Sequence, residues 1–276
     1  ADIDMLSAWT VTEGTDDVVV VIMDDGVDFD HPDLAPNAWV NPGEDLNSDG
    51  VITPDEENGI DDDGNGYVDD FHGWYTNYDT NEYLTSGSFH GTHVAGTVGA
   101  ASYNGIGVAG VAPGVKLASV MFFDEDGNAD AASILGAYSY ITALLEQGVN
   151  VVAINQSWGG GDYYYGDPNQ SYMVQEMTMH AFDHADYGAL WVVSAGNSSV
   201  DRDNLYFYSY PNNIPAPNII TVASSTVADE LSDFSDFGVR TVDIAAPGSD
   251  IISTYPNGEF AYLSGTSMAA PHVSGV

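Results

Sequence analysis

The 276-residue sequence has no cysteine, only 3 lysine and arginine residues, and no apolar run long enough to cross a membrane. The lack of cysteine excludes disulfide bonds, thiolate metal ligands and a cysteine nucleophile. Against the few basic residues stand 42 Asp and Glu, which give a formal net charge of -39. Because such a surface repels phosphate backbones and anionic lipids, we expect no nucleic acid partner and no membrane partner.

The same acidity makes a compact chain repel itself unless cations are bound, which indicates calcium, a salty environment or both. The apolar fraction of 44% excludes a disordered polyanion. We expect residues 1–276 to form a single domain around one large core. The N-terminus lacks the basic-then-apolar pattern of a signal peptide, so we expect a processed form.

Short β-branched runs alternate with helical patterns along the chain. The first run, at 18–23, is followed by Asp24-Asp25-Gly26 and is typical of a buried parallel strand that ends in a polar turn. Further strands are predicted at 117–122, 149–155, 190–195 and 219–224, and helices at 90–101, 130–147 and 171–187. This alternation predicts an α/β fold with a doubly wound, mostly parallel sheet, whose ligands bind beyond the carboxyl ends of the strands.

Two segments depart from the alternation. Residues 41–72 are dense in Asp, Asn and Gly and have few apolar residues, which indicates an acidic insertion loop within the domain. The chain ends nine residues after Ser267, within a helical pattern that is still in progress. We therefore expect the protein to continue beyond residue 276.

Three residues in polar clusters at predicted strand or helix ends suggest acyl transfer. Alone, each has an ordinary structural interpretation, such as Asp24 acting as a turn residue. Together, Asp24, His90 and Ser267 supply a carboxylate, a base and a nucleophile. Ser267 lies in a Gly-Thr-Ser-Met turn that opens a helix, where backbone amides and the helix dipole can stabilise an oxyanion.

The sequence resembles the subtilase family in three segments: Val-Ile-Met-Asp-Asp-Gly-Val-Asp-Phe-Asp-His-Pro-Asp-Leu at 21–34, His-Gly-Thr-His-Val-Ala-Gly-Thr at 90–97, and Gly-Thr-Ser-Met-Ala-Ala-Pro-His at 265–272. The order Asp, His, Ser is that of subtilisin. The resemblance implies a three-layer fold with helices on both faces of the sheet. It also implies a secreted endopeptidase, in which Asp24 orients His90, His90 acts as the base and Ser267 attacks.

Further expectations follow from the same resemblance. The substrates would be proteins or peptides, a propeptide would take part in maturation, the protein would be a monomer, and helices would follow residue 276. Val193-Ser-Ala-Gly-Asn197 matches the segment of the family that carries an oxyanion-binding asparagine. Asn197 would then donate its amide to the oxyanion, the alternative being an ordinary turn residue.

A second segment is similar to the family's substrate-binding edge, which pairs with an extended peptide by β-augmentation. It consists of Ser157, Trp158, Gly159 and Gly160. The glycines permit close approach, and Trp158 is either a pocket wall or a core residue. Ala195 and Gly196 are expected in the same pocket.

Two acids resemble the kexin and furin branch, in which such residues bind basic substrate side chains. They are Asp25 and Asp162, the latter four positions after Trp158. The cysteine-bearing segment that completes the furin pocket is absent, so both acids are alternatively surface residues of a very acidic protein. A desolvated carboxylate in such a pocket would need a charged partner.

The insertion carries calcium-loop patterns. Residues 45–56 place oxygen ligands at positions 1, 3 and 5, Gly50 at position 6 and Glu at position 12, which is the EF-hand loop pattern. The predicted ligands are Asp45, Asn47, Asp49, the Val51 carbonyl and Glu56. Pro54 argues against an ordinary exiting helix, and the alternative is a solvated acidic loop without a metal.

The next stretch repeats the pattern in part and resembles an insertion of large secreted bacterial subtilases. Its predicted ligands are Asp61, Asp63, Asn65, Tyr67 and Asp69. A third site is implied only by resemblance to the high-affinity calcium site of subtilisins. It would comprise Asp33, Asn104, Ile106 and Val108.

The sequence therefore predicts a secreted serine endopeptidase in which calcium is structural and the reaction needs no cofactor. One alternative is a non-catalytic calcium-binding adhesion or scaffold module, which would be expected to lack a member of the triad. The other is a processing peptidase that requires a basic side chain next to the scissile bond.

Overall fold

The computed structural model describes residues 3–81, 89–160, 168–204 and 209–276. Its centre is a seven-stranded sheet in the order β2-β3-β1-β4-β5-β6-β7, with every neighbouring pair parallel. The strands are β1 (Val19–Asp24), β2 (Gly73–Tyr75), β3 (Lys116–Met121), β4 (Val151–Gln156), β5 (Leu190–Ser194), β6 (Ile219–Ser225) and β7 (Ile244–Pro247).

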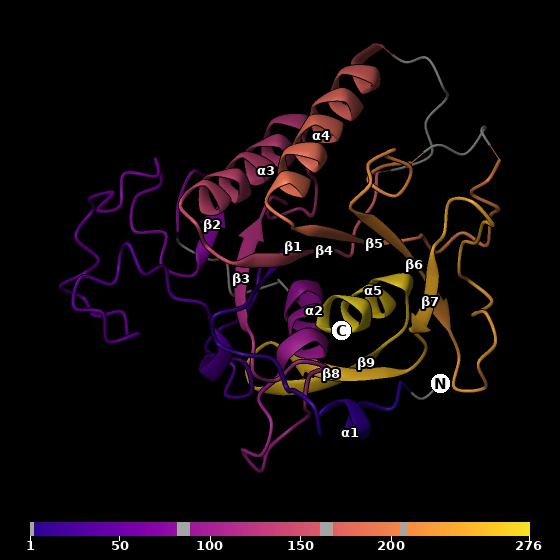
Figure 1. Cartoon of the computed structure of the whole chain (residues 1–276), viewed down its shortest axis with the longest axis horizontal. Coiled ribbons are helices and arrows are strands. Elements are labelled where there is room, and N and C mark those ends of the chain that lie inside the picture. The colour runs from indigo at the N-terminus through magenta and orange to yellow at the C-terminus, as the bar shows by residue number, and fades with distance from the viewer. Residues whose placement is uncertain (1–2, 82–88, 161–167, 205–208) are drawn as a thin grey trace.

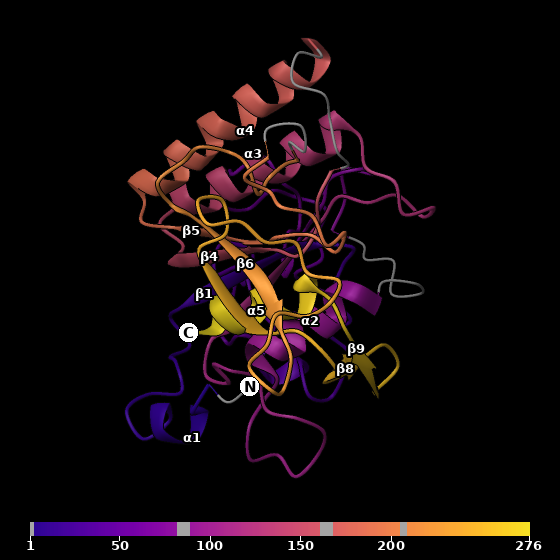
Figure 2. The same ribbon diagram turned by 90° about the vertical axis from the view of Figure 1, so that its right-hand side faces the viewer.

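Helices cover both faces of this sheet (Figures 1 and 2). On one face lie α3 (Ala131–Glu146) and α4 (Pro168–Asp186), and on the other lie α2 (Phe89–Gly99) and α5 (Thr266–Gly275). An antiparallel hairpin of β8 (Ile251–Tyr255) and β9 (Glu259–Leu263) lies against α2. The helices α1 (Met5–Ala8) and η1 (Ala35–Asn37) are short. This arrangement confirms the predicted three-layer α/β fold.

Strand β1 shows why the sheet is buried on both faces. Val19, Val21 and Met23 pack in the core beside α3 and α4, whereas Val20 and Ile22 pack in the core beside α2 and α5. Successive side chains of a strand point to opposite faces, so a run of six residues that are all buried fits only a central strand. The last residue of β1 is Asp24, which therefore lies at the carboxyl edge near the middle of the sheet.

The predicted elements agree with the observed ones to within a few residues. The helix predicted at 130–147 includes its two capping residues, since the Asp130 carboxylate accepts from Ser133 N at 2.8 Å and Gln147 is the C-cap. The sequence did not predict β2, β7 or the β8-β9 hairpin. Residues 41–72 contain no helix or strand. No helix in the described ranges is long and apolar enough to span a bilayer.

Candidate active site and acidic insertion

Asp24 and His90 meet where the end of β1 faces the first turn of α2. The His90 Nδ1 atom lies 2.8 Å from Asp24 Oδ1, and the Asp24 side chain is buried. Asp25 N also donates to Asp24 Oδ1 at 2.9 Å, which fixes the carboxylate. The contact holds the imidazole with a proton on Nδ1 and leaves Nε2 to act as a base.

The charges around His90 favour its protonated form. Burial by itself lowers the pKa of His90, but the Asp24 charge and hydrogen bond, with a smaller contribution from Asp25, outweigh it and raise the pKa to about 9. The pKa of Asp25 is raised to about 7, mainly by desolvation and then by the Asp24 charge. The pair of acids therefore stabilises an imidazolium, the species that forms when His90 takes a proton.

Ser267 is the second residue of α5, and Ser157 holds it in place. Ser267 Oγ donates to the Ser157 carbonyl at 2.9 Å, while Ser157 Oγ donates to the Ser267 carbonyl at 2.8 Å. Asn155 Nδ2 donates to Ser157 Oγ at 2.9 Å, which ties the pair to β4. In this conformation the serine hydroxyl faces the Ser157 carbonyl rather than His90. Catalytic hydrogen bonds are often incomplete before substrate binds.

Asn197 lies beside the start of α5. Its Oδ1 atom accepts from both the backbone amide and the hydroxyl of Thr266, each at 2.9 Å. Because the side-chain oxygen is held by two donors, the amide nitrogen has a fixed direction. That nitrogen donates to no group in the described part of the chain, so it can donate to a developing oxyanion.

A pocket of about 250 Å³ opens beside Ser267. Besides Ser267 itself, its lining includes six other residues predicted from the sequence: Ser157, Trp158, Gly159, Gly160, Gly196 and Asn197. The structure thus brings the predicted nucleophile, oxyanion donor and substrate edge around one pocket. Trp158 also packs against Phe122 in the core, with ring centroids 4.8 Å apart, so it is both wall and core.

The remaining predicted substrate residues have other positions. Ala195 is fully buried and does not line the pocket. The Asp25 carboxylate accepts from the backbone amides of His90 at 3.3 Å and Gly91 at 2.6 Å. It thereby fills the role of a cap at the start of α2, and its binding to basic substrates stays a prediction. Asp162 lies outside the described residues.

In the predicted EF-hand loop the side chains turn inward onto the loop backbone. Asp45 Oδ2 accepts from Gly50 N at 2.7 Å, and Asp49 Oδ1 accepts from Val51 N at 2.9 Å. Glu56 accepts from Thr53 N at 2.9 Å and from Asn47 N at 3.4 Å. The carboxylates of the loop are therefore held by amides of the same loop. A calcium ion bound there stays a prediction.

In the second calcium motif the side chains also accept hydrogen bonds from loop amides. Asp61 accepts from Gly64 N at 2.7 Å and Gly66 N at 2.9 Å, and Asn65 Oδ1 accepts from Tyr67 N at 2.7 Å. Asp69 accepts from Asn58 N at 3.2 Å and Gly59 N at 2.9 Å, and calcium binding by this set stays a prediction.

Among the described residues, one group of acids has three ligand atoms within 4.8 Å of one another. It consists of Glu44, Asp63 and Asp70. Glu44 and Asp70 are fully buried, and desolvation raises the pKa of each to about 7. Asn41 Nδ2 bridges Asp63 and Asp70 at 3.0 and 2.7 Å, whereas Glu44 Oε2 is buried without a hydrogen-bond partner in the described ranges. An orphaned, buried carboxylate oxygen among acids fits a site for a hard cation.

The third predicted site is assembled around Asp33. Its carboxylate accepts from Asn104 Nδ2 at 2.5 Å and from Val108 N at 2.9 Å, and Ile106 N donates to Asn104 Oδ1 at 3.1 Å. The structure therefore brings Asp33 and the loop 104–108 together, as the resemblance implied. Calcium binding at this site stays a prediction.

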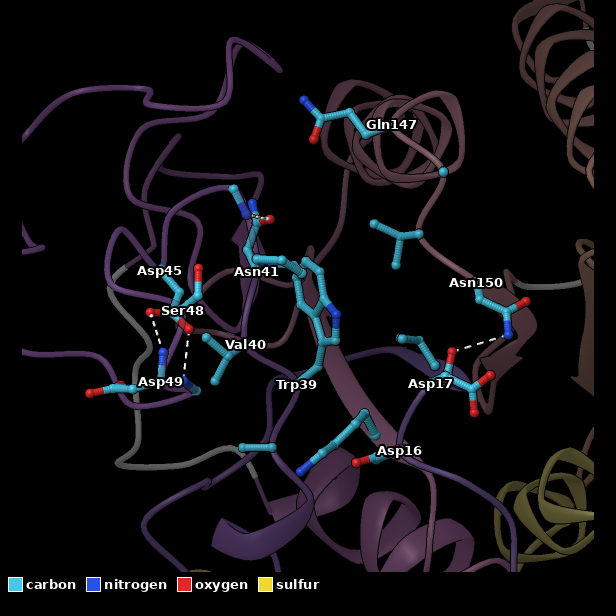
Figure 3. Close-up of a pocket in the computed structure, with 18 residues that line it drawn as sticks. Asp16, Asp17, Trp39, Val40, Asn41, Asp45, Ser48, Asp49, Gln147 and Asn150 are labelled. Carbon is cyan, nitrogen blue, oxygen red and sulfur yellow. Dashed lines mark hydrogen bonds between the residues drawn. The ribbon is translucent and has the colours of Figure 1, made fainter.

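A larger cavity of about 920 Å³ lies at the opposite edge of the sheet, between the insertion and the amino ends of β1 and β3. Trp39 stands between the Asp45 loop on one side and Asp17 with Asn150 on the other (Figure 3). Asn150 Nδ2 donates to the Asp17 carbonyl at 3.0 Å. The catalytic candidates lie at the carboxyl ends of the strands, so this cavity is separate from them.

Sequence reasoning missed several residues of these sites. Glu44 and Asp70 flank the patterns that were recognised, and Glu44 lies one position before the EF-hand motif. Thr266 has no pattern of its own apart from its place before the serine. Arg202 lines the pocket and Asp236 binds Arg202. The two residues are 34 positions apart and carry no joint signal in the sequence.

Comparison with known proteins identifies the family of this fold and site. The family model described as the subtilase family matches residues 15–276. Thermitase from Thermoactinomyces vulgaris is 33% identical over 270 residues, which cover 98% of this chain and 76% of thermitase. The chain therefore belongs to the subtilase family.

Other similar proteins extend beyond the aligned region. An extracellular basic protease from Dichelobacter nodosus is 33% identical over 94% of this chain, but the match covers only 42% of that protein. A major intracellular serine protease from Bacillus subtilis is 33% identical over 94% of this chain and 66% of its own length. Among solved structures, a cold adapted subtilisin-like serine proteinase is 25% identical with a TM-score of 0.63, and covers 95% of this chain and 75% of its own.

Proposed function

We propose that this chain is the catalytic domain of a secreted serine endopeptidase that hydrolyses proteins through an acyl-enzyme. The observation that carries the proposal is the 2.8 Å contact between His90 Nδ1 and Asp24 Oδ1, with Ser267 and Asn197 together at a neighbouring pocket. Family membership supports the same activity. The presence of all three residues, Asp24, His90 and Ser267, also argues against the alternative of a non-catalytic binding module.

In the proposed reaction, Ser267 Oγ forms a bond to the scissile carbonyl carbon while its proton passes to His90 Nε2. The carbonyl oxygen becomes an oxyanion that Asn197 and the backbone amides at the start of α5 stabilise. The C–N bond then breaks, and His90 gives its proton to the departing amine. A water molecule then gives a proton to His90 and bonds to the acyl carbon. The bond from that carbon to Ser267 Oγ breaks, the acid leaves, and His90 returns the proton to Ser267.

The predicted calcium has a structural role in this proposal. Glu44, Asp63 and Asp70 would hold a calcium ion, because Glu44 Oε2 is buried and unpartnered beside two other acids. When bound, the ion supplies positive charge that neutralises these carboxylates. The EF-hand loop 45–56 and the Asp33 loop are further candidates, and their internal hydrogen bonds support preformed loops.

Secretion is supported by the Dichelobacter relative, which is named an extracellular protease, although the Bacillus relative is named intracellular. The strong negative charge is compatible with a salty or calcium-rich exterior. A test is immunodetection of the native protein in cell and medium fractions. Retention in the cell with none in the medium would contradict the proposal.

The test of activity is turnover of casein, an unstructured protein, by the chain in the presence of calcium. We expect cleavage by the wild type and a loss of roughly 10⁶-fold for Ser267→Ala. Ser253→Ala serves as a matched control, since Ser253 is a buried serine outside the site that donates to the His93 carbonyl at 2.7 Å. Equal cleavage by wild type and Ser267→Ala would contradict the proposal.

A further inference from the structure

A buried carboxylate brackets the segment that carries Asn197. Asp236 Oδ1 accepts from Ser198 N at 2.8 Å and from Val200 N at 3.0 Å, and Asp236 N donates to the Gly196 carbonyl at 2.9 Å. These three bonds hold the backbone on both sides of Asn197. Asp236 is fully buried, so water does not compete for its side-chain oxygens.

The charge of Asp236 is neutralised by Arg202, one of only 3 Lys and Arg residues in the chain. Arg202 Nε donates to Asp236 Oδ2 at 2.7 Å, and Arg202 Nη2 contacts the same oxygen. Both side chains lie against Gly196, where a Cβ atom would collide with the carboxylate and the guanidinium. Gly196 has φ +114, so only a glycine suits both its backbone and this close approach.

The pair is connected to the oxyanion donor through a short stretch of backbone. Gly196 N donates to Thr266 Oγ1 at 3.1 Å, and the same hydroxyl donates to Asn197 Oδ1. The Asn197 side chain is therefore set by Thr266 on one side, and its backbone is set by Asp236 on the other. Arg202 also lines the pocket beside Ser267.

We infer that Arg202 and Asp236 are positioning residues for the proposed reaction, which aim the Asn197 amide by fixing the backbone from Gly196 to Val200. This inference rests on the proposed function. The carboxylate supplies the acceptors for two amides, and the guanidinium makes a buried charge tolerable at that position. A small displacement of an oxyanion donor weakens binding of the transition state more than binding of the substrate. The pair therefore acts on kcat rather than on KM.

The experiment is a double-variant cycle on the full chain with a peptide amide substrate. Asp236→Asn is measured alone and in the Asn197→Ala background, with concentrations set by titrating active serines so that only folded molecules count. We expect Asp236→Asn alone to lower kcat by about 10- to 100-fold with little change in KM. In the Asn197→Ala background we expect a further loss of less than about twofold, because the donor to be aimed is gone.

Arg202→Lys is the second variant, and it replaces Asp236→Asn in the cycle if the latter yields no folded protein. Its matched control is Arg240→Lys, which alters an exposed arginine that lies 3.5 Å from Asp203. We expect a fall in kcat for Arg202→Lys and none for the control. The fall in kcat for Arg202→Lys should be equal for a substrate with an acidic side chain before the scissile bond and for one with an uncharged side chain there.

Three results would overturn the inference while leaving the proposed function intact. The first is an equal loss of kcat from Asp236→Asn in both backgrounds of the cycle, and the second is a change in KM alone. The third is an effect of Arg202→Lys confined to acidic substrates, which would make Arg202 a contact of the substrate. A folded wild-type chain that cleaves nothing would instead contradict the proposed function, and this inference with it.

Discussion

The carboxyl edge of the sheet and the acidic insertion both collect carboxylates, but they hold them differently. At the sheet edge, Asp24 ends a strand that is buried on both faces, and His90 opens a helix packed on it. In residues 41–72 there is no helix or strand, and most acids accept hydrogen bonds from amides of their own loop. Strands and helices therefore fix the first region, whereas hydrogen bonds within the loops hold the second, together with a bound cation in our proposal.

The largest effect is expected at the sheet edge, from Asp24→Asn. Loss of the carboxylate removes the correct imidazole orientation, so kcat should fall by roughly 10⁴-fold. In the wild type, kcat/KM should rise with pH and level off above the His90 pKa of about 9, since only the neutral imidazole takes a proton. In Asp24→Asn, the midpoint of the rise in kcat/KM should move to lower pH. A pH–rate profile measures both, and an unchanged midpoint would contradict the contact.

The next effect in size concerns the oxyanion donor. Asn197→Ala should lower kcat by roughly 10²–10³-fold and leave KM nearly unchanged, because the amide is used mainly in the transition state. Asn218→Ala is a matched control, as its buried side chain donates to the Ala189 carbonyl at 2.9 Å, away from the pocket. Steady-state kinetics with active-site titration measures the change. An equal loss in both variants would show a structural effect only.

The smallest effect is expected in the insertion, and on stability rather than on chemistry. Calcium at about 100 times its Kd should raise the Tm of the wild type by roughly 5–10 °C. Glu44→Gln should abolish most of this rise yet melt no lower than wild type without calcium, since it removes a buried, unpartnered carboxylate oxygen. The measurement is calorimetry with calcium or a chelator. Every protein, including the one with wild-type Glu44, carries Ser267→Ala to prevent self-digestion.

The control for that prediction is Asp55→Asn, which removes an exposed acid of the same insertion. It should keep the full calcium response. If Asp55→Asn and Glu44→Gln lose the response equally, or if neither loses it, the cation does not bind at Glu44.

The sequence predicted the sheet edge well because its signals are local. A β-branched run followed by Asp24, and a helix opening at His90 or Ser267, each place a side chain at the end of an element. In the insertion, a loop pattern names oxygen ligands without fixing which of them meet, so its ligand sets stay predictions. Asp69 fits a ligand position and accepts from the amides of Asn58 and Gly59, while Asp70 next to it is, with Glu44, one of the two buried members of the acid group.

Other features needed the assembled fold. Strand β7 is short and its first two residues are exposed, so it has no strong apolar run to mark it. The Arg202 and Asp236 pair joins two loops that are distant in sequence, and no periodicity connects them. The contacts of Asp25 also needed the fold, because nothing in its neighbourhood in the sequence shows that α2 would bring two amides onto its carboxylate.

The most direct test of the account is covalent labelling by a serine-directed phosphonofluoridate, followed by intact and peptide mass analysis. We predict one adduct per chain, located on Ser267, with labelling that is much slower in His90→Ala because the hydroxyl then lacks its base. No adduct on the folded, calcium-loaded chain, or labelling of Ser267 at the same rate without His90, would contradict the assignment of Asp24, His90 and Ser267 as a working triad.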